Sequence, residues 1–536
     1  MGRLVGGEGV TRRAAAGRIA AGLGGPAAAG ALGGLGLVGG CAAGRAGAGG
    51  PDGSVGRRLG APAIPREFRA LWVATVDNID WPTEPGLSAR RQRAEIRAVL
   101  ETASRLRLNA ILLQVRPTSD ALYASRTEPW SAFLTGRQGV GPEPRYDPLE
   151  EWVREAHARG IDVHAWINPY RVRHPKSIGP DAARHVSKRR PELVREYGPY
   201  LWLDPGAEGS REVVLGVTRE LLRRYDIDGV HMDDYFYPYP IDGEDFPDGE
   251  TYAAYTRRGG RLGKADWRRE NINRLVRDLR DLTHREKPGG IFTVSPFGIW
   301  RPDHPEGVKG FDAYARLYAD SRRWMEEGWV DALMPQLYWP IESAGQPFEP
   351  LLTWWEQYGG PRTHLWPGLY LTRIMPAGSE RASWEPREIV DQIGLIRGSE
   401  RARGFALFSA VGVVEDRRGV TGELASGVLR GGALAPASPW AGGRRPRRAE
   451  VSWGGVGSGA GRSVRVRAGV SDEPPRFVAL RTEGPGGWTT RIAPTGGRRD
   501  VALGLTGEEV RARRVVVNLA GRNGMTSEGA VLTRPA

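Results

Sequence analysis

The sequence predicts an α/β protein: a (β/α)8 (TIM) barrel followed by a small C-terminal β-sandwich. Two observations predict the barrel. Eight short apolar runs recur between residues 69 and 410, and amphipathic helical segments separate most of them. A third observation, alternation of apolar and polar residues after residue 447, predicts the sandwich. The predicted parts are a signal peptide (1–40), a tether (41–65), the barrel (66–425), a linker (426–446) and the sandwich (447–536).

The first 40 residues have the pattern of a secretory signal peptide. Arginines precede a Gly/Ala/Leu stretch that ends in "LVGGC" at Cys41, the only cysteine of the chain. The small residues before Cys41 resemble the bacterial lipobox, so we expect lipidation at Cys41 and an extracytoplasmic protein anchored to the cell membrane by its lipid. The alternative is a secretory signal without lipid. Residues 41–65 follow as a flexible Gly/Ala/Pro tether.

The formal net charge of +13 does not indicate nucleic acid as a partner. The basic residues are spread along the chain among 63 acidic ones, and no basic stripe or RNA-binding motif is present. A positive protein outside the cytoplasm suits anionic wall polymers. We expect a monomer without a cofactor.

The barrel strands are predicted from the eight apolar runs. They span residues 69–75, 109–115, 162–168, 229–235, 292–298, 332–338, 365–370 and 404–410. The segments 89–108 and 148–160 carry apolar residues three and four apart, which is typical of amphipathic helices. Buried strands that alternate with helices form parallel sheets. A doubly wound open sheet is the alternative, but no glycine-rich phosphate loop follows the first run.

Polar residues gather where the runs end, which is where (β/α)8 barrels have their active sites. They include Asp77, Asn78, Gln114, Arg116, Asp120, Asn168, Tyr170, Arg171, His231, Asp233, Asp234, Tyr235, Ser295, Trp300, Arg301, Asp303, Gln336, Tyr338, Trp339, Tyr370, Arg373 and Ser409. Packing alone does not explain such clustering at one pole.

The stretch "DGVHMDDYFYP" is the centre of this group. Asp233 and Asp234 point to opposite sides of a strand unless the strand has already turned. We expect Asp233 to face the barrel axis, because it shares its side with His231. A carboxylate among aromatic rings suits a developing oxocarbenium ion, as nucleophile or as electrostatic stabiliser. The alternative is that Asp234 caps the following turn.

Tryptophans near the strand ends are candidate platforms for sugar rings. They are Trp72, Trp166, Trp300 and Trp339. Core packing is the alternative for each of them.

The general acid stays open at this stage. "DGVHMDDY" is similar to the strand-four signature of family 18 chitinases, whose acid is a glutamate, but Tyr235 stands at that position. A carboxyl group with a pKa raised by burial could donate the proton instead. The candidates are Asp303, Glu342, Asp120 and Asp234.

Several long motifs resemble one family in order along residues 65–420. They are "REFRALWVATVDNIDWP", "LQVRPTSDALY", "WINPYRV", "DGVHMDDYFYP", "SPFGIWR", "LYADSRRWMEEGWVDALMPQLYW" and "PGLY". They resemble the glycosyl hydrolase-like 10 family of bacterial envelope lipoproteins. The resemblance implies a (β/α)8 glycosidase for peptidoglycan strands stripped of stem peptides, cleaved between N-acetylmuramic acid and N-acetylglucosamine. Carried over by motif, the expected site is Arg116, Asp120, Asn168, Arg171, His231, Asp233, Asp234, Gln336 and Tyr338.

The combined prediction assigns roles to these residues. The catalytic candidates are Asp233, Asp234 and Asp303. The substrate-binding candidates are Arg116, Asp120, Trp166, Asn168, Tyr170, Arg171, His231, Tyr235, Trp300, Gln336, Tyr338 and Trp339.

Two other functions remain open. One is a metal-dependent wall hydrolase with His231, Asp233 and Asp234 as ligands, although the usual His-x-His pair on an early strand is absent from the sequence. The other is a glycan-binding protein without catalysis. The C-terminal strands, ending in "NLAGRNGMTSEGAVLT", resemble fibronectin type III modules, and we expect a spacer or wall-binding role for them.

Overall fold

The computed structural model describes residues 59–454, 462–470 and 473–534. The predicted signal peptide, Cys41 and most of the predicted tether lie outside these residues. Among the residues described, no helix combines the length and apolar character needed to cross a membrane.

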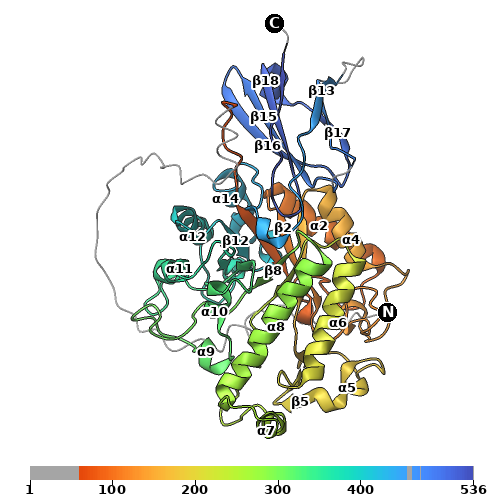
Figure 1. The fold of residues 1–536 in the computed structure, drawn as a ribbon, viewed down its shortest axis with the longest axis vertical. Coiled ribbons are helices and arrows are strands. Elements are labelled where there is room, and N and C mark those ends of the chain that lie inside the picture. Colours follow the sequence, from red (N-terminus) through yellow and green to blue (C-terminus); the bar gives the residue numbers. More distant parts are fainter. Residues whose placement is uncertain (1–58, 455–461, 471–472, 535–536) are drawn as a thin grey trace, which may run out of the picture. The chain divides into compact units, whose positions relative to one another are not determined.

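A curled parallel sheet forms the barrel (Figure 1). Its strands, in sheet order, are β10 (His364–Leu365), β9 (Ala332–Leu333), β8 (Ile291–Val294), β7 (Gly229–Met232), β3 (Asp162–Ile167), β2 (Ala110–Arg116), β1 (Phe68–Val73), β12 (Gly404–Leu407) and β11 (Gly368–Leu369). The two edge strands, β10 and β11, are separated in sequence only by Trp366 and Pro367. One extended segment therefore pairs with β9 on one side and β12 on the other, and the sheet closes through it. The prediction of an α/β barrel is confirmed.

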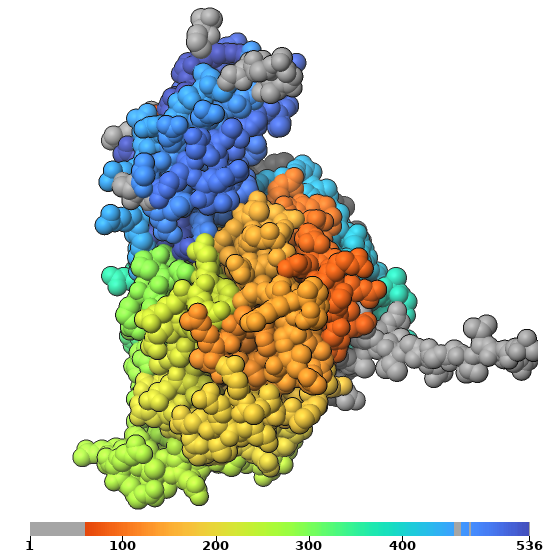
Figure 2. Space-filling view, turned by 90° about the vertical axis from the view of Figure 1, so that its right-hand side faces the viewer, coloured from red at the N-terminus to blue at the C-terminus, as the bar shows by residue number. Residues whose placement is uncertain are grey.

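Helices cover the outside of this sheet (Figure 1). The longer ones are α2 (Ala89–Arg105), α4 (Pro148–Ala158), α6 (Glu208–Arg224), α8 (Lys264–Glu286), α11 (Phe348–Glu356) and α12 (Pro386–Gly398). Local capping sets where the first two begin. The Ser88 hydroxyl accepts the Arg91 N–H at the start of α2, and the Asp147 carboxylate accepts two N–H groups of the first turn of α4, which opens with Pro148. A shorter helix, α7 (Gly249–Arg257), precedes α8 and projects from the surface (Figure 2).

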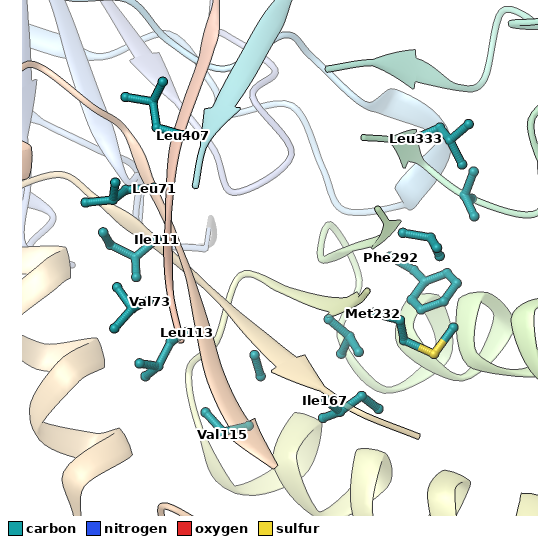
Figure 3. Packing of buried hydrophobic residues seen from close by; sticks show 14 of the residues in the cluster. Leu71, Val73, Ile111, Leu113, Val115, Ile167, Met232, Phe292, Leu333 and Leu407 are labelled. Carbon is teal, nitrogen blue, oxygen red and sulfur yellow. The ribbon is translucent and has the colours of Figure 1, made fainter. Parts of the chain in front are cut away.

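Alternate residues of the strands belong to two different apolar clusters. The outer cluster lies between sheet and helices and includes Leu71, Val73, Ile111, Leu113, Val115, Ile167 and Met232 (Figure 3). The inner cluster fills the barrel and includes Ala70, Trp72, Ala74, Leu112, Trp166, Met334 and Trp366. This separation follows from the period of two along a strand. It also places His231, one residue before Met232, on the inner side.

A small antiparallel sheet was not predicted. Its order is β4 (Arg171–Arg173), β6 (Tyr200–Leu203) and β5 (Val194–Tyr197), and it follows β3 in the chain. Arg171 is paired with Trp202 in this sheet. The backbone of a predicted site residue is therefore held by strand pairing rather than by a free loop.

The C-terminal part is a β-sandwich. One sheet has the order β13 (Glu450–Gly454), β14 (Ser463–Arg467) and β17 (Asp500–Gly504). The other has the order β16 (Gly487–Pro494), β15 (Phe477–Gly484), β18 (Arg514–Ala520) and β19 (Ala530–Thr533). Inward residues such as Val464, Val478 and Val515 share one core. The closer likeness to fibronectin type III modules stays a prediction.

The predicted linker packs against the barrel. The Trp440 indole donates to Asp331 at 2.9 Å, and Leu434 exchanges backbone hydrogen bonds with the segment before β1. Leu434 and Ala441 are buried. The segment is therefore part of the folded structure around the beginnings of the barrel strands.

Candidate active site

The two aspartates lie just beyond the end of β7. The strand stops at Met232, so the alternation of a strand no longer separates their directions. Both side chains are buried, with 5% exposure for each residue. The expectation that the two side chains point to opposite sides applied to a strand that continues through both residues. Here the strand ends before Asp233, so that expectation does not apply.

Asp233 is held by an amide and a backbone group. The Asn168 Nδ2 donates to its Oδ2 at 2.6 Å, and the Tyr235 N–H approaches its Oδ1 at 3.4 Å. Burial and the charge of Asp234 raise the pKa of Asp233 to about 7, although Arg171 and Asn168 oppose the rise. This carboxyl group is suited to hold a proton near neutral pH.

Asp234 has different partners. The Tyr239 hydroxyl donates to its Oδ2. Burial raises its pKa, while hydrogen bonds from Tyr239 and Gln336 favour the charged form. The pair therefore consists of one carboxyl group whose pKa is raised by its neighbour and one whose charge receives two side-chain donors.

A buried amide network orients Asn168. Its Oδ1 accepts from Gln114 Nε2 at 2.5 Å and from Arg171 Nη2 at 2.7 Å, so its Nδ2 must face Asp233. Gln114 is fixed in turn, because its Oε1 accepts the N–H groups of Thr75 and Val76 at the end of β1. The ends of three strands thus determine which atom meets Asp233.

Arg116 supports this network from below. Its Nε and Nη2 bind the Glu128 carboxylate, at distances of 2.7–3.0 Å, and its Nη1 donates to the Asn168 carbonyl at 2.6 Å. The side chain has no exposed surface. The prediction that Arg116 contacts substrate needs correction, because its donors are directed at protein groups.

His231 is also a supporting residue. The Trp72 indole N–H can only donate, and it lies 3.0 Å from His231 Nε2, so Nε2 accepts and the proton sits on Nδ1, 2.8 Å from Thr293 Oγ1. Burial holds its pKa well below the usual value. Both ring nitrogens are occupied by protein partners and the residue is fully buried, so a direct sugar contact or a metal ligand does not fit.

The metal-dependent alternative needs a group of metal-ligating side chains. No group of three or more His, Cys, Asp or Glu side chains within the described ranges could hold a metal ion.

Aromatic rings surround the two carboxylates. Tyr235 lies under the Arg171 guanidinium, 4.9 Å from ring centre to Cζ, and meets Tyr239 edge-on. Tyr338 stacks on Tyr370 with ring centres 4.8 Å apart. The charges of Asp234 and Asp233 help to raise the pKa of Tyr338, after burial, which indicates that this stacked pair lies near the carboxylates. These half-buried rings are suited to contact a sugar.

Two predicted tryptophans lie at the edges of this region. Trp166 belongs to the inner cluster and meets His231 edge-on, and its indole nitrogen has no partner in the part of the chain described. Trp339 is half-buried and packs edge-on against Phe297.

Some predicted residues are not brought to the pair. Asp303 is exposed in the loop after β8, and none of its described contacts reaches Asp233 or Asp234. Trp300 stacks on Trp354 in a separate aromatic group. Tyr170 is completely buried, so a role in binding sugar needs correction to a role in the core.

Asp120 lies in a neighbouring polar group. It accepts from the Thr118 hydroxyl at 2.9 Å and from Gln138 Nε2 at 3.1 Å. Burial raises its pKa, against the opposing charge of His185. Asp120 is itself buried, with 1% exposure, and each of its carboxylate oxygens has a protein donor, so its contact with substrate stays a prediction.

Sequence reasoning missed Glu128, Gln138, Tyr239 and Thr293. Tyr239 had a usable signal, since it ends the tyrosine-rich stretch that follows Asp234. Glu128 and Gln138 had none, because both lie in an irregular loop between β2 and α4.

An α/β barrel with two buried carboxylates just after one of its strands has the chemical groups that glycoside hydrolases use. The sequence matches the glycosyl hydrolase-like 10 family over residues 67–385. The chain therefore belongs to this family, as the motifs predicted, and it is a glycoside hydrolase.

Two relatives agree with this assignment. Glycosyl hydrolase YngK of Bacillus subtilis is 37% identical over 395 residues, which cover 72% of this chain and 76% of the relative. Glycosyl hydrolase DigH of Escherichia coli K12 is 36% identical over 338 residues, which cover 59% of this chain and 76% of the relative. Among solved structures, the PgaB glycoside hydrolase domain of Bordetella bronchiseptica is 13% identical, covers 67% of this chain and 98% of that one, and has a TM-score of 0.44. That likeness is too distant to bear on function.

Proposed function

We propose that this glycoside hydrolase acts in the cell envelope on peptidoglycan strands that lack stem peptides, at the bond between N-acetylmuramic acid and N-acetylglucosamine. The motif resemblance supports the substrate, and the pattern of residues 1–40 with Cys41 supports export and a lipid anchor. The net positive charge suits a polyanionic wall. The observation that carries the catalytic part is the buried pair Asp233 and Asp234, of which Asn168 donates to the first and Tyr239 to the second.

The pair divides the chemical work. Asp233, whose pKa of about 7 keeps part of the molecules protonated near neutral pH, donates its proton to the glycosidic oxygen as that bond breaks. Tyr239 and Gln336 donate to Asp234 and favour its charged form, and this charge would stabilise the oxocarbenium-like transition state. Water adds to the anomeric carbon and its proton returns to the carboxylate of Asp233. The stacked Tyr338 and Tyr370 provide a flat surface for a neighbouring sugar ring.

The test uses the purified protein with peptide-free strands and, separately, with intact peptidoglycan. Mass spectrometry of soluble fragments should show release from the peptide-free strands. Asp233→Asn should slow this release by about 100-fold or more, the usual contribution of a general acid. The same variant should lose far less on a dinitrophenyl glycoside, because that leaving group needs no proton.

The matching variant Asp303→Asn separates the two candidate acids. Only a variant of the true acid should lose much activity on strands and little on the dinitrophenyl glycoside. Strands that are retained by the protein but never cleaved would contradict the proposed substrate. Full activity of Asp233→Asn on strands would contradict the proposed acid.

A further inference from the structure

The arginines at the active-site end fall into two groups. Arg116 and Arg171 are used within the protein, on Glu128, on the Asn168 side chain and on backbone carbonyls. Arg373 and Arg381 lie after β11, and neither guanidinium makes a hydrogen bond or ion pair with another described residue. Arg373 is half-buried and Arg381 is exposed. An arginine without a partner at the end of a barrel strand has its donors available for a ligand.

The loop after β11 carries both arginines and contacts one of the stacked tyrosines. Tyr370 follows the strand directly, and Arg373 ends the single turn Leu371–Arg373. The Trp384 N–H then returns to the Arg373 carbonyl at 3.1 Å, and the Trp384 ring meets Tyr370 edge-on at 6.3 Å. The loop is therefore folded back onto the tyrosine that stacks with Tyr338.

The positive charges of Arg373 and Arg381 both act on Tyr370. Burial raises the pKa of Tyr370, and the positive charges of Arg373 and Arg381 oppose this rise. The charges of Asp233 and Asp234 act on Tyr338, the other ring of the stack. The stacked pair of Tyr338 and Tyr370 is therefore under the influence of carboxylates through one ring and of two arginines through the other.

We propose that Arg373 and Arg381 bind the lactyl carboxylate of an N-acetylmuramic acid residue next to the cleaved bond. This inference rests on the proposed function and deepens it. The lactyl carboxylate is a free anion only when the stem peptide has been removed, because in intact peptidoglycan it is an amide. Two arginines beside an aromatic platform would recognise the anion by charge-assisted hydrogen bonds, and so make peptide-free strands the preferred substrate.

The experiment compares peptide-free strands with the same strands after their lactyl carboxylates have been converted to methylamides. The wild type should have a kcat/KM about tenfold higher on the free acid, because a hydrogen bond to a charged group contributes roughly one such factor. Arg373→Gln and Arg381→Gln should each raise KM on the free acid by a similar factor and leave kcat within about twofold. Neither change should affect the methylamide.

Three controls make the result specific. Arg261→Gln removes the same charge from an exposed position between α7 and α8 and should behave as the wild type. Arg373→Lys keeps the charge and should restore part of the affinity. The exposed Arg381 tests the idea even if Arg373→Gln folds poorly.

The outcomes separate this inference from the proposed function. If the wild type cleaves the free-acid and methylamide strands equally, or the arginine variants lose equally on both, the proposed carboxylate site is wrong. The proposed substrate is unaffected by either result. A wild type that cleaves neither form would overturn the proposed substrate and this inference with it.

Discussion

At the scale of residues, the site depends on how two adjacent carboxyl groups are kept different. Asp233 and Asp234 are equally buried, yet their partners differ: an amide for one, a tyrosine hydroxyl and a glutamine for the other. Donors that favour the charge of Asp234 also make the ionisation of Asp233 harder, because like charges at close range repel. The tyrosine-rich stretch after the pair therefore sets which carboxyl group keeps the proton.

This arrangement predicts a dependence of stability on pH that Asp233→Asn should remove. The folded protein raises the pKa of Asp233 from 3.8 to about 7, so between these values it binds more protons than the unfolded chain. Wild-type stability attributable to this group is therefore present below about pH 4 and falls as pH rises toward 7. The uncharged Asn mimics the protonated state, so the variant should gain on the wild type by about 2–4 kcal/mol between pH 4.5 and 8.

Urea unfolding at the two pH values measures this gain, with Asp242→Asn at an exposed position as the control. A gain that does not change with pH would show that Asp233 is ionised at neutral pH and would count against its role as the acid.

At the scale of elements, the ends of β2 and β3 are fixed by one buried ion pair. Arg116 ends β2, and its contacts reach the loop that carries Glu128 and the backbone at Asn168 and Pro169. A buried arginine with all its donors used positions several segments at once. Asn168 can meet Asp233 because Arg116 holds the backbone under it.

Removing this arginine should therefore cost both stability and activity. Arg116→Met leaves the Glu128 charge buried without its partner, a change that typically costs about 3–5 kcal/mol. The free energy of unfolding from urea titration measures it. The matched change Arg387→Met breaks an exposed pair with Asp391 on α12 and should have little effect on stability, because solvent screens exposed ion pairs. Similar costs for both variants would mean that Glu128 finds other partners when Arg116 is removed.

The sequence was informative where periodicity or position carries the signal. The eight runs predicted the barrel strands, because buried parallel strands need continuous apolar residues. The placement of polar residues at strand ends pointed to Asn168, Asp233, Asp234 and Gln336. In the structure Asn168 donates to Asp233, Gln336 donates to Asp234, and the two aspartates affect each other's pKa.

Supporting residues were harder to predict. Arg116, His231 and Tyr170 have the chemistry of substrate contacts, and only their burial distinguishes them from such contacts. Glu128 lies in a loop without a repeating pattern. Its pairing with Arg116 depends on how that loop folds, and no rule of sequence spacing predicts it. Pairings of this kind depend on tertiary packing, which a single sequence does not state.

At the scale of the whole molecule, β7 carries charge at both of its ends with opposite consequences. Asp228 precedes the strand and is fully partnered: His157 Nε2 lies 2.7 Å away, and Arg522 of the C-terminal sandwich donates to it at 2.8 Å. Burial by itself raises the pKa of Asp228, but Arg476, His157 and Arg522 hold it well below its usual range. Asp233, after the strand, has an amide partner instead, and burial and the charge of Asp234 raise its pKa to about 7. In β7, the charged residue before the strand therefore stabilises the fold, and the one after it is the candidate for chemistry.

The cluster around Asp228 gives the last prediction. Arg522 also binds Asp226, and both arginines of the sandwich that reach these aspartates are almost fully buried. Arg522→Met should therefore lower the free energy of unfolding by about 3–5 kcal/mol at pH 7, since it leaves a buried carboxylate short of its partner. The control Arg467→Met breaks an exposed pair with Asp500 in the same sandwich and should cost less than about 1 kcal/mol.

The sign of its pH dependence follows from the lowered pKa of Asp228. A carboxyl group with a lowered folded pKa stabilises the protein above its unfolded value, near 3.8, and this stabilisation is lost as pH falls further. The penalty of Arg522→Met, measured by urea unfolding, should accordingly be largest at neutral pH and shrink below about pH 4. Calorimetry of the variant should also show whether the barrel and the sandwich still unfold together. A constant penalty down to pH 3 would mean that Arg522 stabilises by packing alone, and would remove the electrostatic link between the start of β7 and the C-terminal sandwich.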